Sequence, residues 1–272
     1  MKQRPSIYWE KISAIDYAYV DDAGHPLGDS FYISARLSSR ELNDNFFVAD
    51  FGKMKKELKE FIDLKFDHVL WLNQDKHRAT QGNGGFNVVT SAFEYSGPEC
   101  AFFLYHKDPL QTLQKQIQSY LDQHYPSRQF EIHIGRTDTK SARIMRYTHG
   151  LKKHDGNCQR LLHGHRSILT QLDASVPSKV IEFIEMQLDG KHLVWKENIT
   201  NENKDWIKIS YSSSQGQYHL KIKPSLCHIL PAESTIENIT SYVGHLLKKQ
   251  FPTLQGRLYL REGLDKGALI EL

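Results

Sequence analysis

The chain has 272 residues, of which 39% are hydrophobic and 25% are charged, which are the proportions of a globular protein with a buried core. The formal net charge is only +3, and lysine and arginine are dispersed, so we expect no nucleic-acid partner. No apolar run approaches the ~18 residues of a membrane span, and the first residues lack the apolar region of a secretory signal. The three cysteines are widely spaced and suggest no disulfide framework, so the expected location is the cytoplasm.

Helix and strand patterns alternate along the chain. Apolar residues at helical spacing predict three amphipathic helices, at 54–62, 110–121 and 236–247. Asp50 is a candidate N-cap of the first helix, and Ser234 or Thr235 of the third. Strands are predicted at 30–37, 87–94, 101–106, 129–134, 142–151, 206–212, 218–223 and 256–260. Short turns between sequential strands, such as 212–217, favour an antiparallel sheet with helices on one face, which is an α+β architecture.

The two halves of the chain resemble each other in order. Residues 66–73 resemble 190–197, 104–109 resemble 226–231, 119–121 match 241–243, and 132–137 resemble 258–263. The separation stays near 122 to 126 residues, as a tandem duplication would give. We therefore predict two homologous domains, 1–138 and 139–272, joined around 137–142.

A histidine cluster lies in the second half. His163 and His165 flank one glycine, and on a strand residues i and i+2 point to the same side. His149, on the preceding strand, is the candidate third ligand, and three histidines with an open fourth position are typical of a catalytic zinc site. Cys158 would have a reactive thiolate beside such an ion. The alternative is ordinary: an isolated His-x-His pair is more often a surface or core feature, and an isolated cysteine is more often inert.

These residues carry a resemblance to a known family. Residues 147–151 (YTHGL), followed by Cys158 and His163-Gly-His165, resemble the zinc-and-cysteine signature of the 6-pyruvoyl tetrahydropterin synthases and of their bacterial relatives, the 6-carboxytetrahydropterin synthases of queuosine biosynthesis. Other blocks are also similar: 50–55 to the DFxxLK helix start, 64–73 to the LDHxxLN block, 234–239 to the PTxENI helix, and 259–263 to the closing strand with its glutamate.

The resemblance implies a fold and an activity. The fold would be two tandem T-fold (tunnelling-fold) domains, each an antiparallel sheet with helices on one face. The activity would be that of a zinc-dependent lyase that releases triphosphate from 7,8-dihydroneopterin triphosphate and rearranges or cleaves its side chain. The 6-carboxytetrahydropterin product is favoured over the 6-pyruvoyl one, although the sequence leaves the product open. A homo-oligomer is expected because an incomplete barrel leaves sheet edges unpaired.

The resemblance also implies roles for individual residues. Zn²⁺ would be held by His149, His163 and His165. Cys158 would act as a general base, and Asp67 and His68 would tune its thiolate or carry protons. Glu262 would hold the pterin ring, and Thr235 would lie near it. Alternatively, Glu262 is an ordinary glutamate at a strand end and Thr235 only a helix cap. Gly263 departs from the family, whose members usually have threonine after the glutamate.

The family's residues are divided between the halves. The second half holds the histidines, the cysteine and the glutamate, whereas the first half holds Asp67 and His68. At the corresponding positions, the first half reads Leu27-Gly28-Asp29 for the His-x-His pair and Arg136 for the glutamate, and the second half reads Lys191-His192 for the Asp-His pair. We therefore predict that Asp67 and His68 complete the site around Cys158, within a chain or between chains.

Two other functions fit parts of the pattern. A nitrile reductase of deazaguanine metabolism also uses tandem T-fold domains, but it would require a nicotinamide cofactor and no catalytic zinc. A non-catalytic T-fold protein that binds a pterin or purine would explain the scattered residues as remnants. The complementary losses in the two halves argue against random decay.

Overall fold

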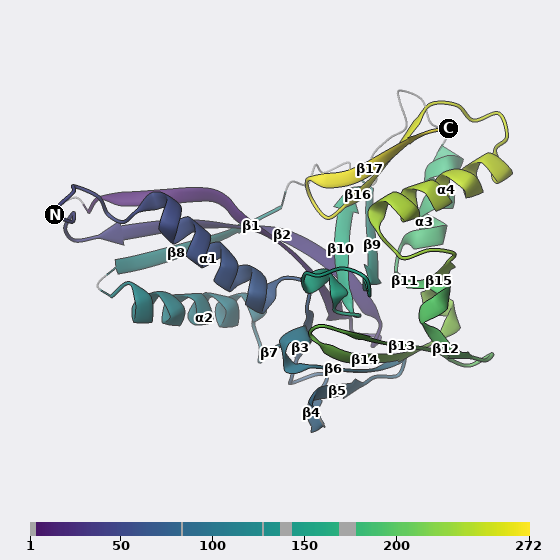
Figure 1. Ribbon diagram of the computed structural model, residues 1–272, viewed down its shortest axis with the longest axis horizontal. Coiled ribbons are helices and arrows are strands. Elements are labelled where there is room, and N and C mark those ends of the chain that lie inside the picture. The colour runs from purple at the N-terminus through teal and green to yellow at the C-terminus, as the bar shows by residue number, and fades with distance from the viewer. Residues whose placement is uncertain (1–3, 83, 127, 137–142, 169–177) are drawn as a thin grey trace.

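The computed structural model describes residues 4–82, 84–126, 128–136, 143–168 and 178–272 (Figure 1). Within these ranges the chain is a mixed α+β protein, as predicted. The described helices are α1 (Phe51–Phe66), α2 (Pro109–His124), α3 (Ser178–Leu188) and α4 (Ile236–Gln250). Among the described residues, no helix is both long and apolar enough to span a lipid bilayer. The predicted boundary between domains, at 138/139, lies outside the described residues.

The second half repeats the element order of the first and adds one strand at its end. The first half runs β1 (Ser6–Val20), β2 (Pro26–Ser39), α1, β3 (Leu70–Asn73), β4 (Ala79–Gly82), β5 (Gly85–Val89), β6 (Phe93–Gly97), β7 (Phe102–Tyr105), α2 and β8 (Arg128–Gly135). The second runs β9 (Ile144–His149), β10 (His163–Ile168), α3, β11 (Lys191–Trp195), β12 (Ile199–Glu202), β13 (Ile207–Ser213), β14 (Gly216–Ile222), β15 (Cys227–Leu230), α4, β16 (Arg257–Glu262) and β17 (Lys266–Glu271). This repeated order of elements agrees with the predicted duplication.

The described strands form four sheets. The sequence predicted antiparallel sheets, but two of the four also contain parallel pairs. Their orders are β7-β3-β1-β2-β8, β10-β9-β11-β15, β12-β13-β14-β6-β5-β4, and the hairpin β16-β17. In the first sheet β3 runs parallel to both β1 and β7, and in the second β11 runs parallel to both β9 and β15. The reason is the helix that precedes each of these strands: it carries the chain back along the sheet, so the next strand runs in the direction of the first.

The third sheet joins the two halves. Its strands β4, β5 and β6 come from the first half and β12, β13 and β14 from the second, and β14 pairs with β6 through residues such as Leu220 and Tyr95. Three apolar clusters fill the interior: one contains α1 and α2, another α3 and α4, and the remaining one lies at the joint sheet with side chains from both halves. The halves therefore share a core as well as a sheet.

The three predicted helices are present as α1, α2 and α4, whereas α3 was not predicted. The Asp50 side chain accepts a hydrogen bond from Lys53 N at 2.7 Å, and the Thr235 side chain caps α4 by accepting from Asn238 N at 3.4 Å. The predicted strand 87–94 is wrong: it is two strands, because Thr90 Oγ1 accepts from the backbone of Ala92 and Phe93 and closes a turn between β5 and β6. That turn has none of the usual glycine, proline or asparagine signals.

Two hairpins cross at a pair of glycines. Gly28 of β2 and Gly164 of β10 occupy matching positions, since Gly28 pairs with Ala18 and Gly164 pairs with Thr148 in their own hairpins. A Cβ on Gly164 would lie 2.6 Å from Gly28 Cα, and one on Gly28 would lie 2.5 Å from His165 O. Only glycine allows backbones to approach this closely. The crossing brings the first half against the histidine strand of the second.

Candidate metal and active site

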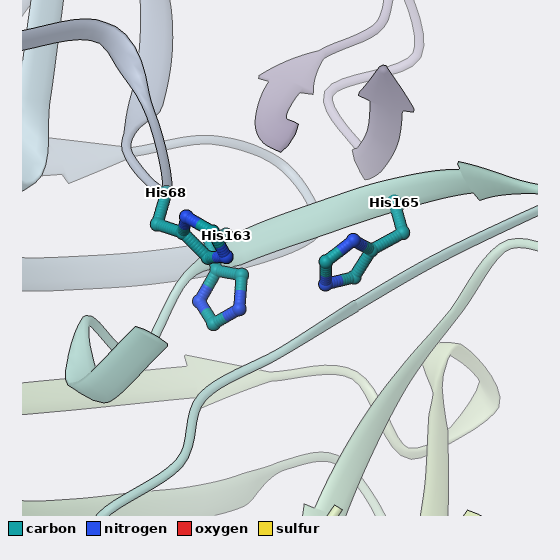
Figure 2. Close-up of side chains that lie close together, drawn as sticks. All are labelled: His68, His163 and His165. Carbon is teal, nitrogen blue, oxygen red and sulfur yellow. The ribbon is translucent and has the colours of Figure 1, made fainter. Parts of the chain in front are cut away.

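The predicted histidines converge on one buried position. His163 and His165 lie on β10 with their ring centroids 5.5 Å apart, and His149, at the end of β9, pairs directly with His163 in the hairpin. All three rings are 0–1% exposed. The prediction that residues i and i+2 present both imidazoles to one side is confirmed (Figure 2). The glycine between them, Gly164, lies against the backbone of the first half, since a Cβ there would be 2.6 Å from Gly28 Cα.

Hydrogen bonds fix the orientation of two of the rings. His149 Nδ1 lies 2.9 Å from Ser234 O, and His163 Nδ1 lies 2.7 Å from Arg160 O. A carbonyl oxygen only accepts, so each Nδ1 carries the proton and each Nε2 presents a lone pair. Burial and the neighbouring imidazoles lower the pKa of both His149 and His163 well below its usual value, which keeps these rings in the neutral form that binds metals.

The Nε2 atoms fit a metal ion. His149 Nε2 and His165 Nε2 lie 2.9 Å apart, and the buried His163 Nε2 has no hydrogen-bond partner in the described part of the chain. Nitrogen ligands of a tetrahedral zinc lie about 3.3 Å apart, from Zn–N distances of ~2.0–2.1 Å. Three sets of described residues place a ligand atom from each member within 4.8 Å of the others: His68 with His163 and His165, Glu262 with His149 and His165, and Asp16 with Asp67 and His68. His165 is common to the first two sets, whereas the three predicted ligands do not occur together in one set. Nδ1 bonds to carbonyl groups are usual for metal-binding histidines.

Asp67 and His68 reach this position from the first half. They follow α1 directly, and His68 Nδ1 lies 2.5 Å from Asp67 Oδ2. The His68 ring is 4.6 Å from the His163 ring, centroid to centroid (Figure 2). Burial opposes the His68 cation, but the Asp67 carboxylate outweighs it, and the Cys158 thiol adds to the effect, so the pKa of His68 is raised well above its usual value. The Asp-His pair and the cysteine therefore meet within one chain.

Cys158 lies in a short 3₁₀ turn, Asn157–Gln159, between β9 and β10. Its side chain is half-buried. Leu151 N donates to the Cys158 carbonyl at 2.8 Å, which fixes the turn against the end of β9. The backbone of the turn is thus held at the end of β9, and the thiol lies beside His68.

Arg160 connects the two halves at this point, and no motif in the sequence indicated it. The side chain is fully buried, and its Nη1 donates to Asp67 O at 3.0 Å while its Nη2 donates to Leu64 O at 3.4 Å. Its own carbonyl accepts from His163 Nδ1. The guanidinium thus satisfies carbonyls at the C-terminal end of α1, where a cation is favoured, and it sets the position of the Asp-His pair relative to His163.

The repeat equivalent of Asp67-His68 is Asp189-Gly190, not Lys191-His192 as the sequence alignment indicated. Asp67 Oδ1 accepts from Asp16 N at 2.8 Å, and Asp189 Oδ1 accepts from Arg146 N at 2.7 Å. The next residue donates its N–H to the same partner's carbonyl in both halves. His68 and Gly190 also share a positive φ, 55° and 69°. The matching tryptophans of β3 and β11 had shifted the sequence alignment by two residues.

Glu262 lies near His165, and Thr235 follows the residue that contacts His149. Glu262 ends β16, with its Oε1 3.9 Å from His165 Nε2 and its Oε2 3.3 Å from Lys266 Nζ. Thr235 caps α4, and its neighbour Ser234 is the residue that holds His149. The position equivalent to Glu262 in the first half holds Arg136, which pairs with Asp29 at 2.5 Å. In the first half the Asp29–Arg136 ion pair thus takes the positions that His165 and Glu262 take in the second half.

Comparison with known proteins gives a limited likeness. No family model matches the chain, and no curated protein matches it. Among solved structures, a catalytic-residue mutant of Plasmodium vivax 6-pyruvoyltetrahydropterin synthase is 17% identical with a TM-score of 0.39, covering 49% of this chain and 92% of its own. Another structure of the Plasmodium vivax 6-pyruvoyl tetrahydropterin synthase is 19% identical with a TM-score of 0.36, covering 52% of this chain and 94% of its own. These values are too low to support an argument about function, which has to rest on the site.

Proposed function

We propose that the protein is a zinc-dependent pterin synthase, a lyase that converts 7,8-dihydroneopterin triphosphate into a 6-substituted tetrahydropterin. The observation that carries the proposal is the meeting, in one buried place, of three imidazoles, two of which have their Nε2 atoms 2.9 Å apart, and an Asp-His pair beside a cysteine. A metal set alone fits many proteins. A metal set beside a cysteine and an oriented histidine fits proton abstraction from carbon next to an oxygen that the metal polarises.

The metal would be held by His149, His163 and His165 through their Nε2 atoms. When bound, Zn²⁺ supplies a Lewis acid that stabilises negative charge on a side-chain oxygen of the substrate. The three rings are buried, and the lowered pKa of His149 and His163 keeps those two neutral, so the chain presents two ligands that need not lose a proton first.

The proton transfers would be the work of three residues. Cys158 would remove a proton from the carbon of the pterin side chain, and the adjacent His68 would return one. Asp67 would hold His68 by its Nδ1–H, so that Nε2 faces the thiol. Because the Asp67 carboxylate raises the pKa of His68 well above its usual value, the ring would already be the imidazolium before the transfer, and this cation would stabilise the Cys158 thiolate and could give up a proton.

The pterin ring would be recognised by Glu262. A carboxylate accepts two parallel hydrogen bonds from an amino group and a ring N–H, which Arg136 at the equivalent position of the first half does not offer. Thr235, at the start of α4, would contribute at the edge of the same site. The 6-carboxytetrahydropterin product, and with it a place in queuosine biosynthesis, is our first choice over the 6-pyruvoyl product.

The deciding experiment incubates the zinc-loaded protein with 7,8-dihydroneopterin triphosphate and identifies the products by mass. We expect loss of the triphosphate and a tetrahydropterin whose mass distinguishes a carboxyl from a pyruvoyl side chain. The matched control is the Cys158→Ser variant loaded with zinc, which should bind the metal and turn over at least ~10²-fold more slowly. Bound zinc with an unchanged substrate would instead favour a non-catalytic pterin-binding protein.

A homo-oligomer in the cytoplasm belongs to the same proposal. In the described chain β8 ends the first sheet with one side unpaired, and an exposed strand edge of this length is usually covered. Light scattering coupled to gel filtration should give a mass that is a multiple of 31.5 kDa. A monomer at micromolar concentration would contradict this part of the proposal.

A further inference from the structure

Asp16 is a buried carboxylate that faces the histidine cluster from the other half of the chain. It lies in β1, its residue is 4% exposed, and its Oδ1 is 3.3 Å from His165 Nδ1. Ser30 Oγ donates to the same oxygen at 2.5 Å. Asp16 was not among the residues predicted for the site, because β1 was not predicted as a strand.

His165 differs from the other two histidines in what lies beside its Nδ1. His149 and His163 each face a backbone carbonyl. His165 Nδ1 is buried without a hydrogen bond within the described ranges, and the carboxylate of Asp16 is the oxygen that stands next to it. A carboxylate beside the outer nitrogen favours the tautomer that carries its proton there, and so leaves Nε2 free.

The surroundings of Asp16 hold its carboxylate in place. Gly263 has a φ of +69°, and a Cβ at that position would lie 2.5 Å from Asp16 Oδ1. Lys266 Nζ lies 3.6 Å from Asp16 Oδ2 and 3.3 Å from Glu262 Oε2. Glycine after Glu262 is therefore explained by the carboxylate that it leaves room for. A threonine there, as in the family that the sequence resembles, would collide with Asp16.

The backbone of Asp16 also holds the Asp-His pair. Its N–H donates to Asp67 Oδ1 at 2.8 Å, and its carbonyl accepts from His68 N at 2.7 Å. The repeat equivalent, Arg146, makes the same two backbone contacts with Asp189 and Gly190. Both halves thus use the backbone at this position in the same way. A carboxylate side chain is present in the first half, as Asp16, and it faces His165.

We propose that Asp16 is a positioning residue that fixes the ring of His165, with Nδ1 toward the first half and Nε2 toward the metal. The inference rests on the proposed function to the extent that it places a metal at the three histidines. It adds that the metal centre is built from both halves of the chain, since the second half supplies the ligands and the first half supplies the carboxylate that orients one of them.

The test compares metal binding by the full chain and its Asp16→Asn variant. Zinc affinity is measured by competition with a chelator, and the absorption spectrum of the Co²⁺-substituted protein reports the ligand geometry. We expect the variant to bind zinc about 10–100-fold more weakly and to show an altered Co²⁺ spectrum. Wild-type affinity together with a wild-type spectrum would overturn the inference.

Two further variants control for folding. Asp29→Asn removes a carboxylate that pairs with Arg136 in the first half, and it should leave zinc affinity unchanged. Ser30→Ala keeps the Asp16 carboxylate and removes the Ser30 hydroxyl that donates to it. We expect Ser30→Ala to lose less zinc affinity than Asp16→Asn, and this comparison can be made even if Asp16→Asn folds poorly. Equal losses in Asp29→Asn and Asp16→Asn would overturn the positioning role.

The outcomes separate this inference from the proposed function. If the wild-type chain binds zinc but leaves the pterin triphosphate unchanged, the proposed activity fails and the affinity comparison still decides the role of Asp16. If the wild-type chain turns over the pterin and Asp16→Asn binds zinc normally, the inference fails alone. A wild-type chain that binds no zinc would overturn both.

Discussion

Asp67 and Asp189 make the same backbone contact in the two halves, but one precedes a histidine and the other a glycine. Each accepts a hydrogen bond from the strand beside it, through Asp16 N and Arg146 N. A carboxylate at this position therefore has a structural reason to exist without any catalysis. Its second oxygen distinguishes the halves, because Asp67 Oδ2 holds His68 Nδ1.

This pair of residues provides a matched test of catalysis against structure. We expect Asp67→Asn to lower turnover by about 10²–10⁴-fold, because the amide no longer stabilises the His68 cation. Both variants should lower the free energy of unfolding by a similar amount, of order 1 kcal/mol, but Asp189→Asn should keep turnover near wild type. Steady-state kinetics and thermal unfolding of both variants provide the comparison. Equal turnover in the two variants would assign Asp67 a structural role alone.

His192 gives a prediction about pH. It is buried on β11 beside Thr148 Oγ1, and burial lowers its pKa to about 3. The folded protein thus keeps it neutral while the unfolded chain takes up a proton below pH ~6.5, so stability is full above that pH and falls as the pH drops toward 3. One such group contributes a slope of about 1.4 kcal/mol per pH unit.

The measurement is denaturant unfolding of metal-free protein between pH 6.5 and 4. We expect His192→Gln to reduce the slope of stability against pH by about one proton. His245→Gln, a change at an exposed position of α4, serves as the control and should leave the slope unchanged. An unaltered slope in His192→Gln would show that the ring is accessible to protons in the folded state.

At the scale of elements, the crossing of the two hairpins decides whether the site can form. Gly28 and Gly164 let β2 and β10 touch backbone to backbone, which brings β1, with Asp16, against His165. Extra side-chain atoms at such a contact have no free space to occupy, and overpacking costs about 1–3 kcal/mol. β2 and β10 would have to separate, and Asp16 would then move away from His165.

Gly28→Ala should therefore destabilise the protein by about that amount and weaken zinc binding as well, although Gly28 touches no predicted ligand side chain. Gly135→Ala, in β8, is the control: a Cβ there meets nothing within 4 Å, so little change is expected. Denaturant unfolding and chelator competition measure the two effects. Gly28→Ala with wild-type zinc affinity would mean that the crossing does not control the geometry of the site.

The elements differ in how far the sequence could predict them. Helices α1 and α4 follow from local patterns and N-caps, and the sequence predicted both. Strand β1 was missed because a bulge between Trp9 and Ser13, with Lys11 at a φ of 50°, breaks its alternation. The parallel partners of β3 and β11 were missed because short turns suggested antiparallel pairing, whereas the intervening helices set the direction.

The candidate site divides in the same way. His163 and His165 come from a local pattern on one strand, and Asp67-His68 from a short motif, so the sequence indicated them. Asp16 and Arg160 act through contacts between residues 93 to 149 positions apart in the chain. No local pattern reports such contacts, and each residue alone looks like an ordinary charged side chain.

At the scale of the whole molecule, the halves are joined more closely than two domains on a linker. The joint sheet pairs β14 with β6, and the cluster around it takes apolar side chains from both halves, including Tyr95 and Leu220. Figure 1 shows this sheet below the histidine hairpin, with the first half's helices on the opposite side from those of the second. Separation would expose apolar surface on both halves.

A chain divided between residues 136 and 143 tests this dependence. Residues 143–272 carry the three histidines and Cys158, but alone they lack Asp16, the Asp-His pair and the partner strand of β14. We expect this fragment expressed alone to be aggregated or to bind a hydrophobic dye, and to bind zinc at least ~10-fold more weakly than the whole chain.

Co-expression with residues 1–136 should restore a soluble complex, because burial of the shared cluster favours association of the halves in the same way that it favours folding. Gel filtration of the co-expressed pair and zinc affinity of the complex are the measurements. If the fragment alone is folded and binds zinc as tightly as the whole chain, then the second half is an independent metal-binding domain. The first half's role would then be limited to the catalytic role that we propose for His68 and Asp67, without a part in building the metal centre.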